Sequence, residues 1–205
     1  MRVCGMALVA CLAVAWPARL AAQEGRVPAW DAPTFLPPRP GDDLGVYVLD
    51  PSGGDWALAG IWRQSGNLNL GVRLGVADGA DETPVFFGAE FYGPLVRAGR
   101  ESPLEVAWLL GAGATLDGGT FFRIPAGVSV GAVIDGDELL FVPYAVPRVG
   151  LDVFDDESEF SFTVDLGVDL EIDRSLLLRF GAALGDHDAI GVGAAWRVGR
   201  RVTAR

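Results

Sequence analysis

The stretch EFSFTVDLGVDLEID, residues 159–173, alternates between apolar and polar side chains along its whole length. One phase is entirely apolar: Phe160, Phe162, Val164, Leu166, Val168, Leu170 and Ile172. The other phase carries only Glu, Ser, Thr, Asp and Gly. A period of two residues belongs to a β-strand, whereas a helical stripe repeats every 3.6 residues. The stretch predicts one long strand, and it leaves open which of its faces meets a protein interior.

Similar alternation recurs along most of the chain, interrupted by short breaks rich in the turn-forming residues Gly, Asp and Ser. We predict ten strands, at 44–50, 55–64, 68–77, 84–96, 104–116, 120–134, 138–154, 158–173, 175–185 and 189–198. Fifteen residues of strand span about 50 Å, enough to cross the ~25 Å apolar band of an outer-membrane barrel when tilted. The prediction is an all-β fold: an antiparallel up-and-down meander closed into a single transmembrane-type β-barrel of 8–10 strands over residues 44–198.

The predicted strands contain prolines, among them Pro125, Pro143 and Pro147. Proline cannot donate a hydrogen bond to a strand ladder, and a closed barrel has no free edge on which to place it. We therefore expect β-bulges at these prolines, or strand ends that lie beyond the membrane. This uncertainty is why the predicted strand number is eight or ten.

The polar faces of the strands distinguish a membrane barrel from a soluble one. They are mostly Gly and Ala with an isolated charge, as in Gly71, Arg73, Gly75 and Ala77, rather than the mixed polar residues of a wetted surface. Such faces suit a narrow lumen with paired charges. The candidate lumenal charge network is Arg63, Arg73, Glu90, Glu105, Arg123, Arg148, Asp152, Asp165, Asp169, Arg179 and Arg197, and Glu159 shares its phase. Within it, Asp165 and Asp169 are candidate partners of Arg179 and Arg197. We expect the network to hold the barrel closed; the alternative is a lumen that conducts or binds a ligand.

Residues 1–23 have the features of a signal peptide: Arg2, an apolar run over residues 3–16, and small residues before Gln23. Both cysteines, Cys4 and Cys11, lie in this segment, so the mature chain is expected to have no disulfide or cysteine-ligated metal. Lipidation at Cys11, in the sequence LVAC, is an alternative, but the apolar run continues past that cysteine. The segment predicts export, and the barrel pattern predicts the outer membrane.

Residues 24–43 contain five prolines and are predicted to form an extended linker on the periplasmic side, with Trp30 and Phe35 touching a wall or rim. A short basic tail occupies residues 199–205. Without Arg2 and Arg19 of the signal peptide, the mature chain carries 14 basic residues, all arginine, against 27 acidic residues. This balance excludes a nucleic-acid binder, which needs a basic stripe.

The chain resembles the small bacterial outer-membrane β-barrel proteins of the OmpA/OmpX-like group over about residues 44–198. The closing strand GVGAAWRV resembles the terminal signature of such barrels, with Gly193, Trp196 and Val198 in the glycine, aromatic and final hydrophobic places. In place of a final aromatic residue stands Val198, and seven residues follow it. The resemblance implies that outer-membrane lipid and the barrel-assembly machinery, which reads the terminal strand, are partners. The oligomeric state is left open.

Catalytic and metal-binding motifs are sparse. The single histidine, His187, lies in the acidic turn GDHD, where we expect it to be solvated, with no serine close to it in sequence. The acidic turns at 135–137 and 155–157 lack the ligand spacing of a calcium loop. We therefore expect no catalytic residue, no metal site and no cofactor.

Three functional hypotheses follow from these patterns. The leading one is a non-enzymatic outer-membrane β-barrel with a structural or narrow-channel, small-solute role. The first alternative is an exported soluble β-barrel that binds a small apolar ligand, which requires the apolar face of residues 160–172 to point inward. The second alternative is a lipid-modifying enzyme at the barrel rim, which requires a second catalytic group beside His187.

Overall fold

A computed structural model describes residues 28–198 of the protein, apart from the short ranges 53–54, 67–68, 79–82, 100–101, 137–138 and 155–156. The expected signal peptide with Cys4 and Cys11, the expected tail 199–205 and the acids at 137, 155 and 156 lie outside the described residues. Within the described ranges, the chain has no helix with the length and apolar character needed to cross a bilayer.

The described residues form strands that follow the predicted ranges closely. The strands are β1 (Asp43–Pro51), β2 (Trp56–Gln64), β3 (Leu70–Asp78), β4 (Val85–Val96), β5 (Leu104–Leu116), β6 (Thr120–Ala132), β7 (Ile134–Asp135), β8 (Leu140–Phe154), β9 (Glu157–Glu171), β10 (Leu176–Gly185) and β11 (Ala189–Arg197). Alternating burial along them shows why they form: one side chain in two reaches the interior.

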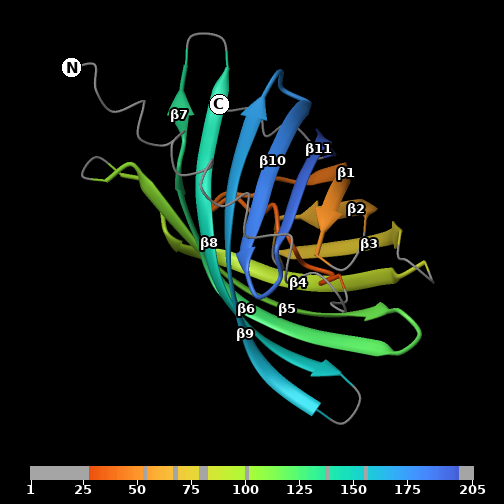
Figure 1. Ribbon diagram of the computed structural model, residues 1–205. Coiled ribbons are helices and arrows are strands. Elements are labelled where there is room, and N and C mark those ends of the chain that lie inside the picture. Colours follow the sequence, from red (N-terminus) through yellow and green to blue (C-terminus); the bar gives the residue numbers. More distant parts are fainter. Residues whose placement is uncertain are drawn as a thin grey trace.

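The strands form one closed antiparallel ring (Figure 1). Sequential strands are neighbours from β1 to β6 and from β8 to β11. The ring closes where β1 pairs with β11 and where β6 pairs with β8, while the two-residue β7 pairs only with β8. The fold is a ten-stranded β-barrel, so the predicted fold class is confirmed at the higher of the two strand numbers.

Of the two alternatives predicted for Pro125, Pro143 and Pro147, the β-bulge is wrong. Pro143 and Pro147 stay in continuous register against β9, and Pro125 lies in register opposite Gly150 of β8. In an antiparallel ladder each N–H group serves only one neighbouring strand, so a proline removes a single hydrogen bond and the remaining bonds keep the register. Among the described pairs of β4 and β5, the register shifts instead between Pro94 and Val96.

The apolar phase of residues 159–173 points away from the barrel axis. Phe160 is 83% exposed and Phe162 53% exposed, whereas Thr163, between the apolar positions, is fully buried. This orientation contradicts the soluble alternative, which needed the apolar face inside. Other strands repeat it with exposed apolar side chains that include Leu44, Val46, Val48, Leu58, Val72, Leu74, Phe87, Leu110, Phe122, Val149, Phe180 and Val192.

The segment before β1 does not lie at a rim. Every residue from 28 to 38 is buried, and Figure 1 shows this orange segment running inside the ring of strands. We call residues 28–40 the plug segment. Of the two predicted contacts of Trp30 and Phe35, a wall or a rim, the structure has the wall, on its inner side. The proline-rich sequence lacks both a strand and a helix period, so nothing in the pattern reveals that the segment lies in the lumen.

Candidate functional site

Two aromatic side chains anchor the plug segment, and inward-facing glycines make room for both. A Cβ atom on Gly88 would lie 2.3 Å from the indole of Trp30, and one on Gly113 would lie 2.7 Å from it. Similarly, a Cβ atom on Gly191 would lie 2.7 Å from the ring of Phe35. These glycines therefore shape the lumen around the plug segment, in addition to relieving the crowding expected in any narrow barrel.

Lumenal side chains also satisfy the backbone of the plug segment, which carries few hydrogen bonds of its own. The Arg73 guanidinium donates three hydrogen bonds, to the carbonyl oxygens of Trp30 (3.1 Å), Pro33 (2.7 Å) and Thr34 (3.1 Å). Further donors are Arg63 to Thr34 O (2.7 Å), Thr115 to Pro28 O (2.6 Å) and Ser129 to Leu36 O (2.7 Å). Because unpaired buried carbonyls are costly, this pairing makes the lumen a binding site for an irregular peptide.

The centre of the lumen contains an ion-pair cluster around Asp31 of the plug segment. Its carboxylate lies 3.1 Å from Arg123 Nε and also pairs with Arg148 Nη1. Arg148 pairs in addition with Asp165 (2.9 Å), and Arg123 pairs with Asp152 (2.8 Å). Asp165 was a candidate partner of Arg179 and Arg197, but the structure places it against Arg148 because β8 and β9 are direct neighbours.

A second group of charges lies beside this cluster. Arg63 pairs with Glu90 at 3.1 Å, and the Thr34 hydroxyl of the plug segment donates to the other carboxylate oxygen of Glu90 at 3.3 Å. The plug segment thus contacts charged side chains from strands all around the barrel.

One end of the barrel, where β1 begins and β11 ends, forms what we call the terminal mouth. Arg179 there pairs with Asp169 (2.9 Å) and with Asp43 (2.7 Å), a residue absent from the predicted network. Asp43 immediately precedes the apolar alternation of 44–50. That position is the sequence feature from which a lumenal Asp43 could have been predicted. These three residues line a cavity of about 250 Å³.

The remaining charges of the predicted network lie toward the same mouth. Glu105 is buried and pairs with Arg39 of the plug segment at 2.9 Å. Arg197 pairs with Glu171, and its side chain is 40% exposed, so it lies at the mouth rather than deep in the lumen. For Glu159, which shares the phase of the predicted network, the expectation of a lumenal position is wrong. It lies near the start of β9, at the opposite end of the barrel from the terminal mouth, where the first four residues of the strand are all exposed.

The prediction that His187 is solvated is wrong. His187 is only 9% exposed, its Nε2 lies 2.7 Å from Asp152 Oδ2, and its ring lies 5.6 Å from that of Phe121. Ser161 reaches the same cluster, where its hydroxyl accepts from Arg123 at 2.6 Å. Among the described residues no hydrogen bond joins Ser161 to His187.

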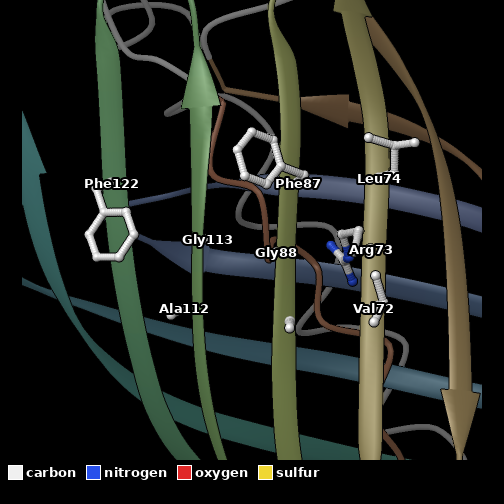
Figure 2. Close-up of a pocket in the computed structure, with 9 residues that line it drawn as sticks. Val72, Arg73, Leu74, Phe87, Gly88, Ala112, Gly113 and Phe122 are labelled. Atoms are coloured by element: carbon white, nitrogen blue, oxygen red, sulfur yellow. The ribbon is translucent and has the colours of Figure 1, made fainter.

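The outer surface of β3 to β6 has a shallow apolar hollow of about 500 Å³. Figure 2 looks onto it, with Phe122 on β6 and Leu74 on β3 at its two sides. The small side chains of Ala89 and Ala112 form part of its lining. On the described outer face no group of three or more acidic, histidine or cysteine side chains is arranged to hold a metal ion, and the same is true of the described lumen.

Comparisons with known proteins give only distant structural similarities. No family model matches the chain, and no curated protein matches it. It is similar to a KdgM porin solved in complex with disordered oligogalacturonate (8% identity, TM-score 0.41, covering 75% of this chain and 98% of the porin). It is also similar to a designed transmembrane β-barrel (14%, 0.36, 78% and 98%) and to a second KdgM porin structure (7%, 0.37, 75% and 98%).

Proposed function

We propose that this protein is a non-enzymatic outer-membrane β-barrel with a structural or narrow-channel role, closed in its resting state by its own plug segment. The observation that carries the proposal is the inverted burial of the ten strands, with apolar side chains outside and charged side chains inside. A soluble barrel has polar side chains on its solvated outer face, whereas a bilayer requires an apolar exterior.

The channel role depends on the plug segment. With Trp30, Asp31, Phe35 and Leu36 each at most 1% exposed, the plug segment fills the part of the lumen in which it lies. A conducting state therefore requires the plug segment to shift. Its contacts are hydrogen bonds, ion pairs and aromatic packing against the barrel wall. The strands of the wall pair with one another along their own ladders, so their pairing does not depend on these contacts.

The proposed partners are outer-membrane lipid around the apolar exterior and the barrel-assembly machinery at the closing strand. In that strand Trp196 and Val198 are exposed on the outer surface, 49% and 61%, where a second protein is able to contact them. The signal peptide expected over residues 1–23 would deliver the chain to the envelope.

Two measurements test this proposal. Cell fractionation should recover the protein in the outer membrane, with a gel mobility that changes on heating in detergent. In planar bilayers the unmodified protein should show little conductance. Recovery from the periplasm without detergent would refute the membrane location, and steady large openings of the unmodified protein would refute the closed resting state.

A further inference from the structure

We infer that the centre of the lumen is a carboxylate-binding site formed by Arg73, Arg123 and Arg148, and that Asp31 of the plug segment is its resident occupant. When the plug segment shifts, a small carboxylate solute takes the place of Asp31. The solute part of this inference rests on the proposed channel role, and it names the class of solute that the lumen would accept.

The first support is the way in which Asp31 is held. It is 1% exposed, and its two oxygens face different strands: Oδ1 lies 3.1 Å from Arg123 Nε on β6, and Oδ2 pairs with Arg148 on β8. Arg148 donates a hydrogen bond to Asp31, whereas Arg123 Nε and Asp31 Oδ1 lie within ion-pair distance without a hydrogen bond between them. Two guanidinium groups thus face one carboxylate, and charged pairs of this kind are favourable for binding an anion. The site thus selects the carboxylate group itself, independently of the peptide that carries it.

The second support is the charge that remains when Asp31 leaves. Arg123 keeps Asp152 and Arg148 keeps Asp165, but Arg73 has no carboxylate within ion-pair distance among the described residues. Its hydrogen bonds in the described lumen go to three carbonyl oxygens of the plug segment. Departure of the plug segment therefore leaves Arg73 without its three carbonyl acceptors and without a carboxylate partner within the described ranges, and an unpaired guanidinium in a narrow lumen favours binding of an anion.

The third support is unused donor capacity. Arg123 Nη2 and Arg148 Nε are buried and have no hydrogen-bond partner in the described part of the chain. The site therefore has more donors than Asp31 occupies, and a solute with further oxygens has groups to bind.

Glycines of the wall make room for both arginine side chains. A Cβ atom on Gly150 would lie 2.6 Å from Arg123 Cζ, and one on Gly127 would lie 2.7 Å from Arg148 Cγ. The site is thus built into strands that remain when the plug segment moves.

Chemical rescue of the full-length Asp31→Ala variant tests the site. The probe is sodium acetate, with sodium chloride at equal ionic strength and the neutral, similarly shaped acetamide as controls. The readout is the temperature at which the detergent-solubilised barrel loses its compact gel mobility. We expect Asp31→Ala to unfold at a lower temperature than the unmodified protein. Acetate should then restore several degrees in a saturable manner, whereas chloride and acetamide should not.

A second variant shows whether the arginines carry the effect. In Asp31→Ala combined with Arg148→Gln, the response to acetate should fall at least tenfold in apparent affinity, while the unmodified protein should not respond at all. If Asp31→Ala folds only when acetate is present during refolding, the site is supported in the same way. Equal stability or equal refolding yield in acetate, chloride and acetamide would overturn the carboxylate site. That failure is distinct from failure of the proposed function, which fractionation and bilayer conductance measure.

Discussion

The indole of Trp30 lies so close to Gly88 that a Cβ atom at that glycine would stand 2.3 Å from its Cε3 atom. One residue belongs to the plug segment and the other to β4, and their contact closes the middle of the barrel. The fit is specific on both sides, because the indole nitrogen also donates to the Arg123 carbonyl oxygen at 3.2 Å. The position of the plug segment is thus determined by the shape of the lumen as well as by its charges.

Substituting Gly88 with alanine should loosen the plug segment. The added methyl group overlaps the indole, and overpacking of this kind costs about 1–3 kcal/mol. We expect Gly88→Ala to unfold at a lower temperature and to show more frequent channel openings in planar bilayers. Gly60→Ala is the matched control, because the nearest atom to a Cβ there is 3.9 Å away. Equal behaviour of the two variants would contradict the role given to the plug segment.

Tryptophan fluorescence should distinguish the lumen, where Trp30 lies, from the outer face of the barrel. Trp30 is 1% exposed, whereas Trp56, Trp62, Trp108 and Trp196 are 37–49% exposed on the outer face. In vesicles of brominated lipid, we expect the four outer tryptophans to be quenched and a residual emission to persist. Trp30→Phe should remove that residual emission. A residual emission that survives Trp30→Phe would show that the plug segment is not shielded in the way described here.

Spin labels on β9 should distinguish lipid from the protein interior. Leu166 is 40% exposed on the apolar face, whereas the neighbouring Thr163, in the opposite phase, is fully buried. We expect a label at Leu166 to be broadened by oxygen dissolved in the bilayer and protected from a water-soluble nickel reagent. A label at Ser161, which is buried in the lumenal phase, serves as the comparison. Protection of Leu166 from both reagents would indicate that it faces protein instead.

Removing the Arg179 guanidinium should destabilise the barrel far more than removing that of Arg197. Arg179 is buried between Asp43 and Asp169, so Arg179→Gln leaves two buried carboxylates without their cation, at a cost of about 3–5 kcal/mol. The Arg197 pair with Glu171 is partly exposed, and such pairs contribute about 0–1 kcal/mol. Urea unfolding in detergent measures both values. Similar losses in the two variants would mean that the buried pairs of Arg179, to Asp169 on β9 and to Asp43 on β1, contribute no more to stability than the exposed pair does.

The strands were predictable because the period of two is a local property. Each of the ten predicted ranges corresponds to an observed strand, including β6 with Pro125 and β8 with Pro143 and Pro147, since single missing hydrogen bonds do not change the alternation. The direction of the faces followed from composition: a face of Gly and Ala with single charges, such as Gly71 and Arg73, suits a narrow lumen and not water.

The specific ion-pair partners of the lumenal charges were harder to predict from the sequence than the strands were. Asp169 was a candidate partner of Arg179, and the two are directly paired across β9 and β10, where neighbouring strands bring them opposite each other. Asp31, Asp43 and the buried state of His187 were missed, because each depends on residues distant in the chain. The Asp31–Arg148 pair joins residues 117 positions apart, and the Arg179–Asp43 bond joins residues 136 positions apart.

Sequence alone determined that this chain forms long strands with one apolar and one small or charged face, because backbone pleating converts every second residue into a face regardless of the rest of the molecule. Only the tertiary structure decided what fills the barrel. The plug segment has no period, and its position depends on Trp30 meeting glycines of β4 and β5 and on Asp31 meeting arginines of β6 and β8. Those contacts exist only after the ring of strands has closed around them.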